Sequence, residues 1–214
     1  MSVAAVVVAA GQGVRFGGPK QFATLGSETV AAHSVRAARS VASRVVIVVP
    51  DDYRGTGEGA DVVVVGGSSR AASVRAGLEQ CAEAEIVVVH DAARPHASSA
   101  LFTAVVNAVL DGADGAVPGL AITDTVKRIE RLDDQSVVWA TVPRDDLVTV
   151  QTPQAFRLDV LKRAHENGAE ATDDAALVEA LGARVVVVLG EADNIKITQL
   201  DDLARLSPSE ESPR

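Results

Sequence analysis

The sequence predicts an α/β fold in which helices flank a mostly parallel sheet. Five short segments consist almost entirely of valine, isoleucine, leucine and alanine, with no polar alternation, which is typical of strands buried on both faces. Helix-like stretches lie between them, and alternating strands and helices favour a parallel sheet. The predicted strands are Val3–Ala9, Val45–Val49, Val62–Val65, Ile86–Val89 and Val185–Leu189.

The helices are predicted from stretches that carry starting and stopping signals. Two of them stop at glycine, at Gly168 and Gly182, as helices often do. The predicted helices are Thr29–Ser40, Ser69–Cys81, Ser98–Leu110, Arg157–Asn167 and Thr172–Leu181.

The segment Ile122–Val142 breaks this rhythm and has no long helical period. Two β-rich runs surround Asp133-Asp134-Gln135, which indicates a hairpin or extended arm over approximately 121–143. An isolated two-stranded ribbon is only marginally stable in water. The hairpin is therefore expected to pack either on a second copy of the chain or back on its own sheet.

Composition limits the class of protein. The 214 residues suit a single domain over 1–206, with 207–214 predicted to be a disordered tail. The net charge of −9 disfavours binding to nucleic acid, and no apolar run approaches the length of a membrane span. Cys81 is the single cysteine, which excludes an internal disulfide and makes the cytoplasm the expected location.

The segment after the first predicted strand is rich in glycine and cations. It contains Gly11 and Gly13, then Arg15, and ends in Pro19-Lys20. Neither the dinucleotide fingerprint nor the Walker pattern fits, because Phe16 and Pro19 stand where those motifs need other residues. Glycine backbone and two cations suit the polyphosphate of a nucleoside triphosphate. The alternative is an ordinary strand-to-helix turn with solvated cations.

Several other charged or glycine-rich clusters also follow predicted strands directly. Ligands bind beyond the carboxyl ends of the strands in open parallel sheets, so these clusters are expected to form one site. They contain Gly66, Gly67 and Arg70 after the third strand, Asp91 and Arg94 after the fourth, and Asp193 and Lys196 after the last.

Asp91 and Asp193 could together hold Mg²⁺, which prefers oxygen ligands and bridges to phosphates. Each aspartate alone would more often be a helix cap, a turn residue or a salt-bridge partner. His33 and His165 are predicted to be structural or solvated, and His90 a near-core side chain. Because protein nucleophiles are poorly represented, the sequence favours direct phosphoryl or nucleotidyl transfer.

These motifs carry a resemblance to a known family. The pieces AAGQGVRFGGPKQF, HDAARP, ITDTVKR, QTPQAF, ATDDAAL and ADNIKIT resemble the 2-C-methyl-D-erythritol 4-phosphate cytidylyltransferases of the non-mevalonate isoprenoid pathway. The resemblance runs from Ala4 to about Leu203. It implies a Rossmann-like nucleotidyltransferase sheet and a Mg²⁺-dependent enzyme that joins CTP to 2-C-methyl-D-erythritol 4-phosphate.

The resemblance also implies roles for individual residues. In this family the arm reaches across a homodimer, so Thr125 and Arg144 would serve the partner's site. The implied catalytic cations are Arg15, Lys20, Arg144 and Lys196. Nucleotide binding is implied for Ala10, Gly11, Gly13, Gly66, Gly67, Arg70 and Ser73. Substrate contacts are implied for Asp91, Arg94, Thr125 and Thr152, and metal binding for Asp91 and Asp193.

Three other functions remain open from the sequence. The nearest is a cytidylyltransferase for another polyol phosphate such as ribitol 5-phosphate, which would need the same loop chemistry. A nicotinamide-dependent dehydrogenase is disfavoured by Phe16 at the third glycine position. A non-catalytic nucleotide-binding module is disfavoured by the retained cations and carboxylates.

Overall fold

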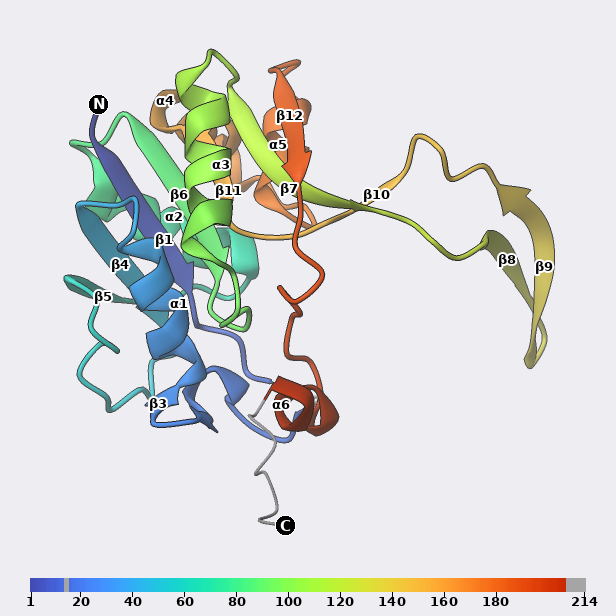
Figure 1. The fold of residues 1–214 in the computed structure, drawn as a ribbon, viewed down its shortest axis with the longest axis horizontal. Coiled ribbons are helices and arrows are strands. Elements are labelled where there is room, and N and C mark those ends of the chain that lie inside the picture. The colour runs from blue at the N-terminus through green and yellow to red at the C-terminus, as the bar shows by residue number, and fades with distance from the viewer. Residues whose placement is uncertain (14–15, 207–214) are drawn as a thin grey trace, which may run out of the picture.

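The computed structural model describes residues 1–13 and 16–206, and Figure 1 shows a layered α/β body from which a two-stranded arm projects. The main sheet contains β1 (Val3–Val8), β4 (Arg44–Val49), β5 (Val62–Val65), β6 (Ile86–Asp91), β7 (Gly115–Ala121), β10 (Val148–Val150), β11 (Gln154–Arg157) and β12 (Val185–Leu189). The helices are α1 (Val30–Ala38), α2 (Arg70–Leu78), α3 (Ser99–Leu110), α4 (Leu158–Ala164), α5 (Asp174–Glu179) and α6 (Leu200–Leu206). Short elements complete the body: β2 (Thr24–Leu25), β3 (Glu28–Thr29) and three 3₁₀ turns, Lys20–Phe22, Glu79–Cys81 and Glu166–Gly168.

The sheet is mostly parallel, as predicted. Strands β6, β1, β4 and β5 pair in parallel in that order. Strands β10 and β11 both pair antiparallel with one edge of β7, each along a different part of that edge. Strand β12 pairs in parallel with the other edge of β7. This places β5 and β12 at the two ends of the sheet.

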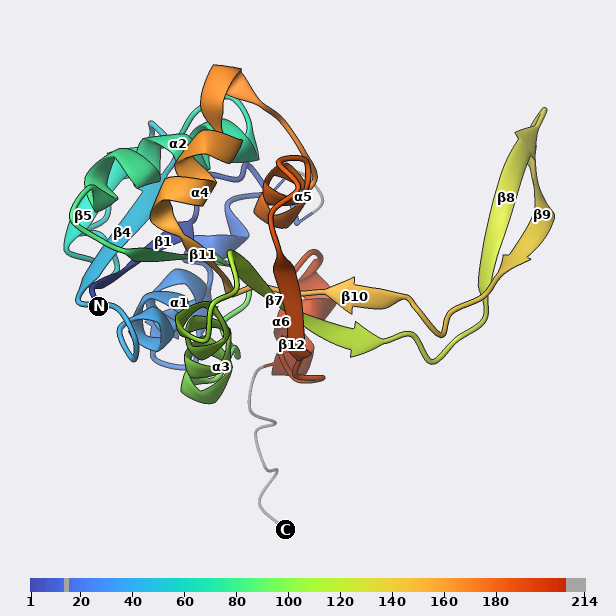
Figure 2. The same cartoon turned by 90° about the horizontal axis from the view of Figure 1, so that it is seen from above.

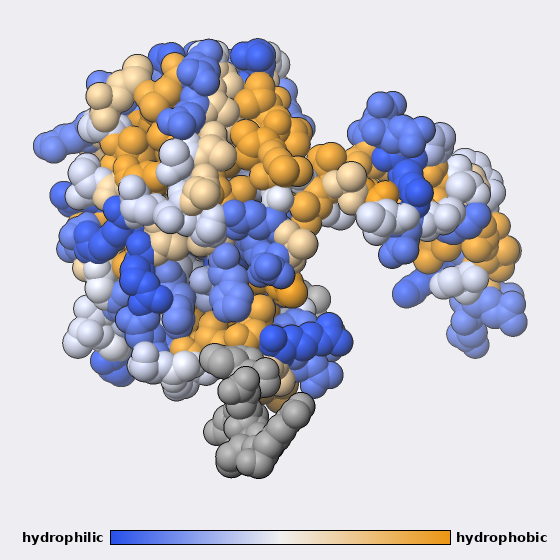
Figure 3. Space-filling view, viewed as in Figure 1, coloured by the Kyte–Doolittle hydropathy of each residue, from blue (hydrophilic) through white to orange (hydrophobic). Residues whose placement is uncertain are grey.

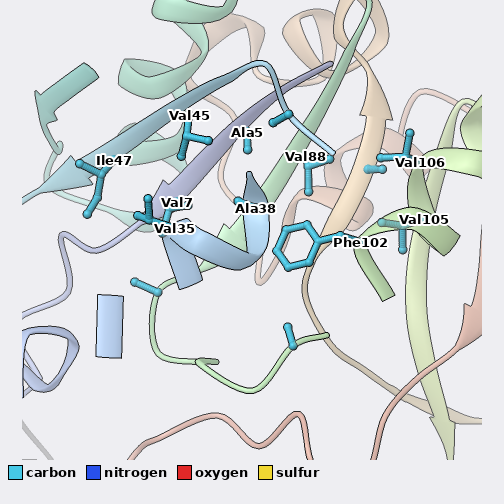
Figure 4. Close-up of a cluster of buried hydrophobic side chains, with 14 of the residues drawn as sticks. Ala5, Val7, Val35, Ala38, Val45, Ile47, Val88, Phe102, Val105 and Val106 are labelled. Atoms are coloured by element: carbon cyan, nitrogen blue, oxygen red, sulfur yellow. The ribbon is translucent and has the colours of Figure 1, made fainter. Parts of the chain in front are cut away.

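Helices cover both faces of the central strands (Figures 1 and 2). Alternate residues of β1 face opposite layers: Ala5 and Val7 pack with α1 and α3, whereas Ala4 and Val6 pack with α2, α4 and α5. Figure 4 shows the first of these clusters, with Phe102 of α3 among the valines of the sheet. This two-sided burial explains the unbroken apolar runs of the central strands.

The prediction of two-sided burial is wrong for the two edge strands. Val65 of β5 is 56% exposed and Leu189 of β12 is 85% exposed. An edge strand has a neighbour on one side only, and the helices do not extend over it fully. The apolar runs predicted the strands correctly but could not show which of them lie at an edge.

The segment Ile122–Val142, predicted to be a hairpin or extended arm, forms a hairpin of β8 (Val126–Leu132) and β9 (Gln135–Val142). The two strands pair with each other and form a separate two-stranded sheet, which extends away from the body (Figures 1 and 2). The hairpin therefore does not fold back on its own sheet. Apolar residues lie on the surface of the arm (Figure 3), including Ile129, Leu132, Val138 and Trp139.

Candidate active site

A cavity of about 470 Å³ lies at the carboxyl ends of the parallel strands. Segments that are far apart in the sequence meet there: the loop after β1, the loop after β5 that starts α2, the end of β6 and the segment after β12. Of the predicted site residues, the structure brings together in its lining Ala10, Gly11, Lys20, Gly67, Arg70, Ser73, Asp91 and Lys196.

The glycine-rich loop turns around the carbonyl of Gly13. This oxygen accepts hydrogen bonds from the backbone N–H groups of Phe16, Gly17 and Gly18 at 2.8, 3.1 and 3.3 Å. Gly13 has a φ of +63°, and a Cβ at this position would lie 1.8 Å from the carbonyl oxygen of Gly18. Only glycine fits this turn, because a side chain would be both strained and in collision with the returning backbone.

The side chain of Gln21 connects this loop to the end of β1 by two hydrogen bonds. The side chain is buried, and Nε2 donates to the carbonyl oxygens of Ala9 at 2.6 Å and Gly11 at 2.9 Å. The amide thereby holds the first residues of the loop at the rim of the cavity. Sequence reasoning did not single out Gln21, although it directly follows Pro19-Lys20.

Gly66 and Gly67 make close packing possible on the other side of the cavity. A Cβ on Gly66 would lie 2.5 Å from the Cβ of Ala10, and one on Gly67 would lie 2.5 Å from the Cβ of Ala72. The missing side chains thus let the loop after β5 approach both β1 and the start of α2. Ser73 adds a hydrogen bond, since its hydroxyl accepts from the backbone N–H of Gly67 at 3.2 Å.

Asp91 lies between two cations at the end of β6. One carboxylate oxygen faces Nε of Arg70 at 3.3 Å, and the other faces Nζ of Lys196 at 2.6 Å. Burial alone would raise the pKa of Asp91, but the charges of Arg70 and Lys196 hold it well below its usual range. The carboxylate is therefore ionised, and it draws both cations to the same point.

A second cavity of about 130 Å³ adjoins the first and shares three of its residues: Arg70, Asp91 and Lys196. Arg94 and Thr152, both predicted to contact substrate, line this smaller cavity. The Arg94 guanidinium donates to the carbonyl oxygen of Asn194 at 2.7 Å, and burial lowers its pKa. The shared cluster of charges thus lies between two chambers, each lined by an additional cation.

His90 is not placed to act as a base. It is fully buried, and burial lowers its pKa to about 4. Its Nε2 lies 3.2 Å from the carbonyl oxygen of Arg94, which can only accept, so Nε2 carries the proton. Its Nδ1 then accepts from the hydroxyl of Thr152, at 3.2 Å. The same hydroxyl accepts from the backbone N–H of Asp91 at 3.0 Å, so Thr152 links His90 to the start of the charged cluster.

Other predicted residues do not join these cavities. Thr125 immediately precedes β8 and Arg144 follows β9 by two residues, and both are exposed. Asp193 is exposed and lines neither cavity. Arg15 lies outside the described residues.

The donor set limits what kind of metal site is possible. Among residues 1–13 and 16–206, no group of three His, Cys, Asp or Glu side chains is placed to hold a metal ion. Asp91 is the one acidic side chain among the described residues that line the larger cavity. These residues do not fit a metal held by protein ligands alone. They fit Mg²⁺ that arrives with a polyphosphate and takes at most one carboxylate from the protein.

Sequence reasoning missed Asp174, whereas His165 has the structural role that was one of the two expected for it. Asp174 begins α5 and contacts Arg70 at 2.7 Å, and His165 contacts Asp174 at 2.9 Å. Both side chains are buried. The pair of aspartates at the start of an apolar helix signals an N-terminus, but nothing in the pattern shows that the second one contacts Arg70.

The fold and the cavity define an α/β protein that gathers cations and glycine backbone at the carboxyl ends of a parallel sheet, as nucleotide-binding proteins do. Comparison with known proteins identifies the family. The model of IspD, 2-C-methyl-D-erythritol 4-phosphate cytidylyltransferase, matches residues 3–207, and the chain belongs to this family.

Individual relatives agree with this assignment. The chain is 44% identical to the 2-C-methyl-D-erythritol 4-phosphate cytidylyltransferase of Streptomyces avermitilis, over 94% of this chain and 88% of the relative. It is also 44% identical to a bifunctional enzyme IspD/IspF from a species of Anaeromyxobacter, of which it spans 58% of the length. The crystal structure of the Thermus thermophilus cytidylyltransferase superposes with a TM-score of 0.81 at 36% identity, covering 96% of this chain and 97% of that one.

No helix among the described residues combines the length and the apolar character needed to cross a membrane.

Proposed function

We propose that this chain is a cytidylyltransferase that joins CTP to 2-C-methyl-D-erythritol 4-phosphate and releases pyrophosphate. The observation that carries this proposal is the pair of adjoining cavities with Arg70, Asp91 and Lys196 between them. Two neighbouring cavities with cations between them suit a reaction between two anionic substrates, because the cations offset the repulsion of the two phosphates. Membership of the family supports the identity of the two substrates.

In the proposed reaction, a phosphate oxygen of the acceptor attacks the α-phosphorus of CTP. A new P–O bond forms there while the bond to the β-phosphate oxygen breaks, and pyrophosphate leaves with that electron pair. A phosphate monoester has a second pKa of about 6, so the attacking oxygen is already ionised at neutral pH. No general base is needed, which agrees with the burial of His90 and its neutral state.

The protein's contribution is then positioning and charge. The glycine-rich loop and Lys20 would bind the triphosphate, and Lys196 lies where the α-phosphate and the acceptor phosphate would meet. Cations held in place before the reaction stabilise charge that develops on the α-phosphoryl oxygens. Arg15 is assigned to the same task by resemblance alone.

Mg²⁺ is proposed as the cofactor. The triphosphate oxygens would supply most of its ligands, with Asp91 as the protein carboxylate, and the ion would neutralise part of the triphosphate charge. The earlier expectation that Asp193 is a second ligand gains no support from its exposed position.

We further propose a homodimer in which the arm carries Thr125 and Arg144 to the partner's site. The support is the separation of the arm from the body and its exposed apolar residues, among them Trp139 at 64%. Single exposed apolar residues are common, but a contiguous set on a projecting ribbon indicates an interaction surface. The cytoplasm stays the expected location, because a chain with one buried cysteine does not depend on disulfides.

The test is a pyrophosphate-release assay with purified protein, CTP and Mg²⁺. Parallel reactions contain 2-C-methyl-D-erythritol 4-phosphate, ribitol 5-phosphate or no acceptor. The proposal expects release with the first acceptor only, and loss of release when EDTA removes the metal. CTP binding without release for any acceptor would contradict the catalytic proposal, and faster release with ribitol 5-phosphate would contradict the acceptor.

A further inference from the structure

A chain of buried charged and polar groups continues from the cavity into the interior. Arg70 donates from Nη1 to Oδ2 of Asp174 at 2.7 Å, and Oδ1 of the same carboxylate lies 2.9 Å from Nε2 of His165. The side chains of Asp174 and His165 are only 1% and 3% exposed. Burying a carboxylate this deeply is costly unless its partners are fixed. The arrangement therefore needs an explanation beyond chance contact.

The position of Asp174 is fixed from two directions. It is the first residue of α5, whose preceding residue Asp173 caps the helix by accepting from the backbone N–H of Ala176 at 3.0 Å. On the other side is His165, whose Nδ1 has no hydrogen-bond partner among the described residues. Its Nε2 faces a carboxylate and so carries the proton, which it donates to Asp174. With one oxygen held by His165, the other oxygen of Asp174 is aimed at Arg70.

Arg70 is consequently held at two of its nitrogens by two different carboxylates, Asp174 at Nη1 and Asp91 at Nε. These bonds use two of the five N–H groups of a guanidinium, so three remain for a ligand. Burial alone would lower the pKa of Arg70, but Asp91 and Asp174 raise it above its usual value. Arg70 lines both cavities, so its direction matters to whatever binds there.

We infer that Asp174, oriented by His165, is a positioning residue that sets the guanidinium of Arg70 for the nucleotide. Without the pull of Asp174, the long side chain of Arg70 is free to move onto Asp91, where it would compete with Lys196. The inference rests on the proposed function and goes beyond it, because neither Asp174 nor His165 lines either cavity.

A simpler role for Asp174 would be to hold the start of α5 against α2 through its ion pair with Arg70. A second ion pair between the same two regions provides a control for this role. Arg75 of α2 pairs with Glu170, four residues before Asp174, at 3.1 Å, and also donates to the carbonyl of Ala169. This half-exposed pair joins the same two regions without contacting Arg70. Because Glu170 also accepts from the hydroxyl of Ser69, which lines the larger cavity, the control variant is Arg75→Gln, which breaks the pair and should leave CTP affinity unchanged.

The experiment is a double-mutant cycle on the affinity for Mg²⁺–CTP, measured by titration calorimetry on the full chain. Asp174→Asn keeps the shape of the side chain and removes its charge, and we expect it to weaken binding about tenfold. Arg70→Ala should weaken binding at least as much. In the Arg70→Ala background, Asp174→Asn should cost nothing further, because it acts only through Arg70. Thermal unfolding of every variant separates lost stability from lost affinity.

Variants of His165 provide a second, milder test. It decides whether Asp174 positions Arg70 if Asp174→Asn does not fold. His165→Gln keeps an N–H donor near Asp174, whereas His165→Leu removes it. The expected order of CTP affinity is wild type, then His165→Gln, then His165→Leu, with the last weaker than wild type by about threefold or more.

Equal losses from Asp174→Asn in the presence and absence of Arg70 would overturn the inference, as would identical affinities for the two His165 variants. A wild-type protein that binds CTP but releases no pyrophosphate would overturn the proposed function and leave this coupling measurable. A wild-type protein that does not bind CTP would overturn both.

Discussion

At the scale of single residues, Asp91 organises the site by attracting cations that repel one another. Arg70 and Lys196 come from distant parts of the chain, and their charges would separate without a carboxylate between them. In the proposed reaction this carboxylate also limits how much positive charge the empty site carries. When the substrates bind, their phosphates attract the two cations and replace part of the attraction that Asp91 exerts on them.

Lys20 supplies the first prediction at this scale. It lines the larger cavity, and Lys20→Ala should lower turnover about 10²–10³-fold while the fold stays intact, because a preplaced cation opposite developing charge is lost. Turnover is measured by pyrophosphate release, and folding by circular dichroism. Lys162→Ala, on the exposed side of α4, is the control. Near-normal turnover in Lys20→Ala would remove Lys20 from the mechanism.

Thr152 supplies the second prediction at the scale of single residues. Its buried hydroxyl accepts from the N–H of Asp91 and donates to His90, so Thr152→Val leaves both groups without a partner. The expected loss of unfolding free energy is about 1–3 kcal/mol, measured by urea denaturation. Thr152→Ser keeps the hydroxyl and should lose much less. If the Val variant is as stable as the Ser variant, the hydroxyl has no structural role and its predicted contact with substrate becomes its main function.

How far the sequence could predict the site depends on what each residue contacts. Asp91 ends β6, and Lys20, Arg70 and Lys196 belong to the segments that follow β1, β5 and β12, so topology brings them together. Asp174 instead contacts Arg70 across the fold, from the start of α5 to the start of α2, and no local pattern encodes this contact. Asp193 follows a strand as well, but its side chain is exposed, and strand order does not determine where a loop residue points.

At the scale of elements, the sequence predicted strands that are uniformly apolar and missed β7, β10 and β11 of the main sheet as well as the two-residue strands β2 and β3. Strand β7 contains Gly115, Pro118 and Gly119, which are ordinarily signals of turns. In the structure the glycines let neighbours approach closely, since a Cβ on Gly115 would lie 2.5 Å from the ring of Phe156. Tertiary packing overrides the local signal here, and β7 then joins the parallel pair with β12.

Helix α6 leads to a prediction about the glycine-rich loop. Phe16, in this loop, packs with Leu203 and Leu206 of α6 on a small cluster that includes Ile197, the neighbour of Lys196. The cluster thus connects the glycine-rich loop, on one side of the cavity, with the segment that carries Lys196, on the other. Phe16→Ala should raise the KM for CTP several-fold, about the effect of losing part of an apolar contact, with little change in the melting temperature.

Two comparisons make this prediction specific. Phe16→Leu keeps most of the contact and should restore the KM. Leu200→Ala changes a residue of α6 that is 63% exposed, and it should have no effect. An unchanged KM in Phe16→Ala would show that the loop is positioned by its own turn at Gly13 instead.

At the scale of the whole molecule, the parallel sheet concentrates chemistry at one rim while the arm carries two predicted site residues away from it. Within one chain, Thr125 and Arg144 flank the hairpin of β8 and β9, which projects from the body (Figure 2), and they line neither cavity. If these residues take part in the reaction, another copy of the chain has to supply them. The molecule's shape therefore makes the proposed dimer a condition for a complete site, and a mixing experiment can test this.

Lys20→Ala and Arg144→Ala should each be inactive as homodimers, because each lacks one component of both sites. In a mixed dimer, one site combines both defects, and the other combines an intact body with an intact arm. Equal mixing with random exchange makes half of the dimers mixed, so activity should return to about a quarter of the wild-type level. The measurement is pyrophosphate release before and after the two proteins exchange subunits, with sedimentation to confirm dimers. No recovery despite exchange would mean that Arg144 serves its own chain or none, and the arm would then be an element of assembly alone.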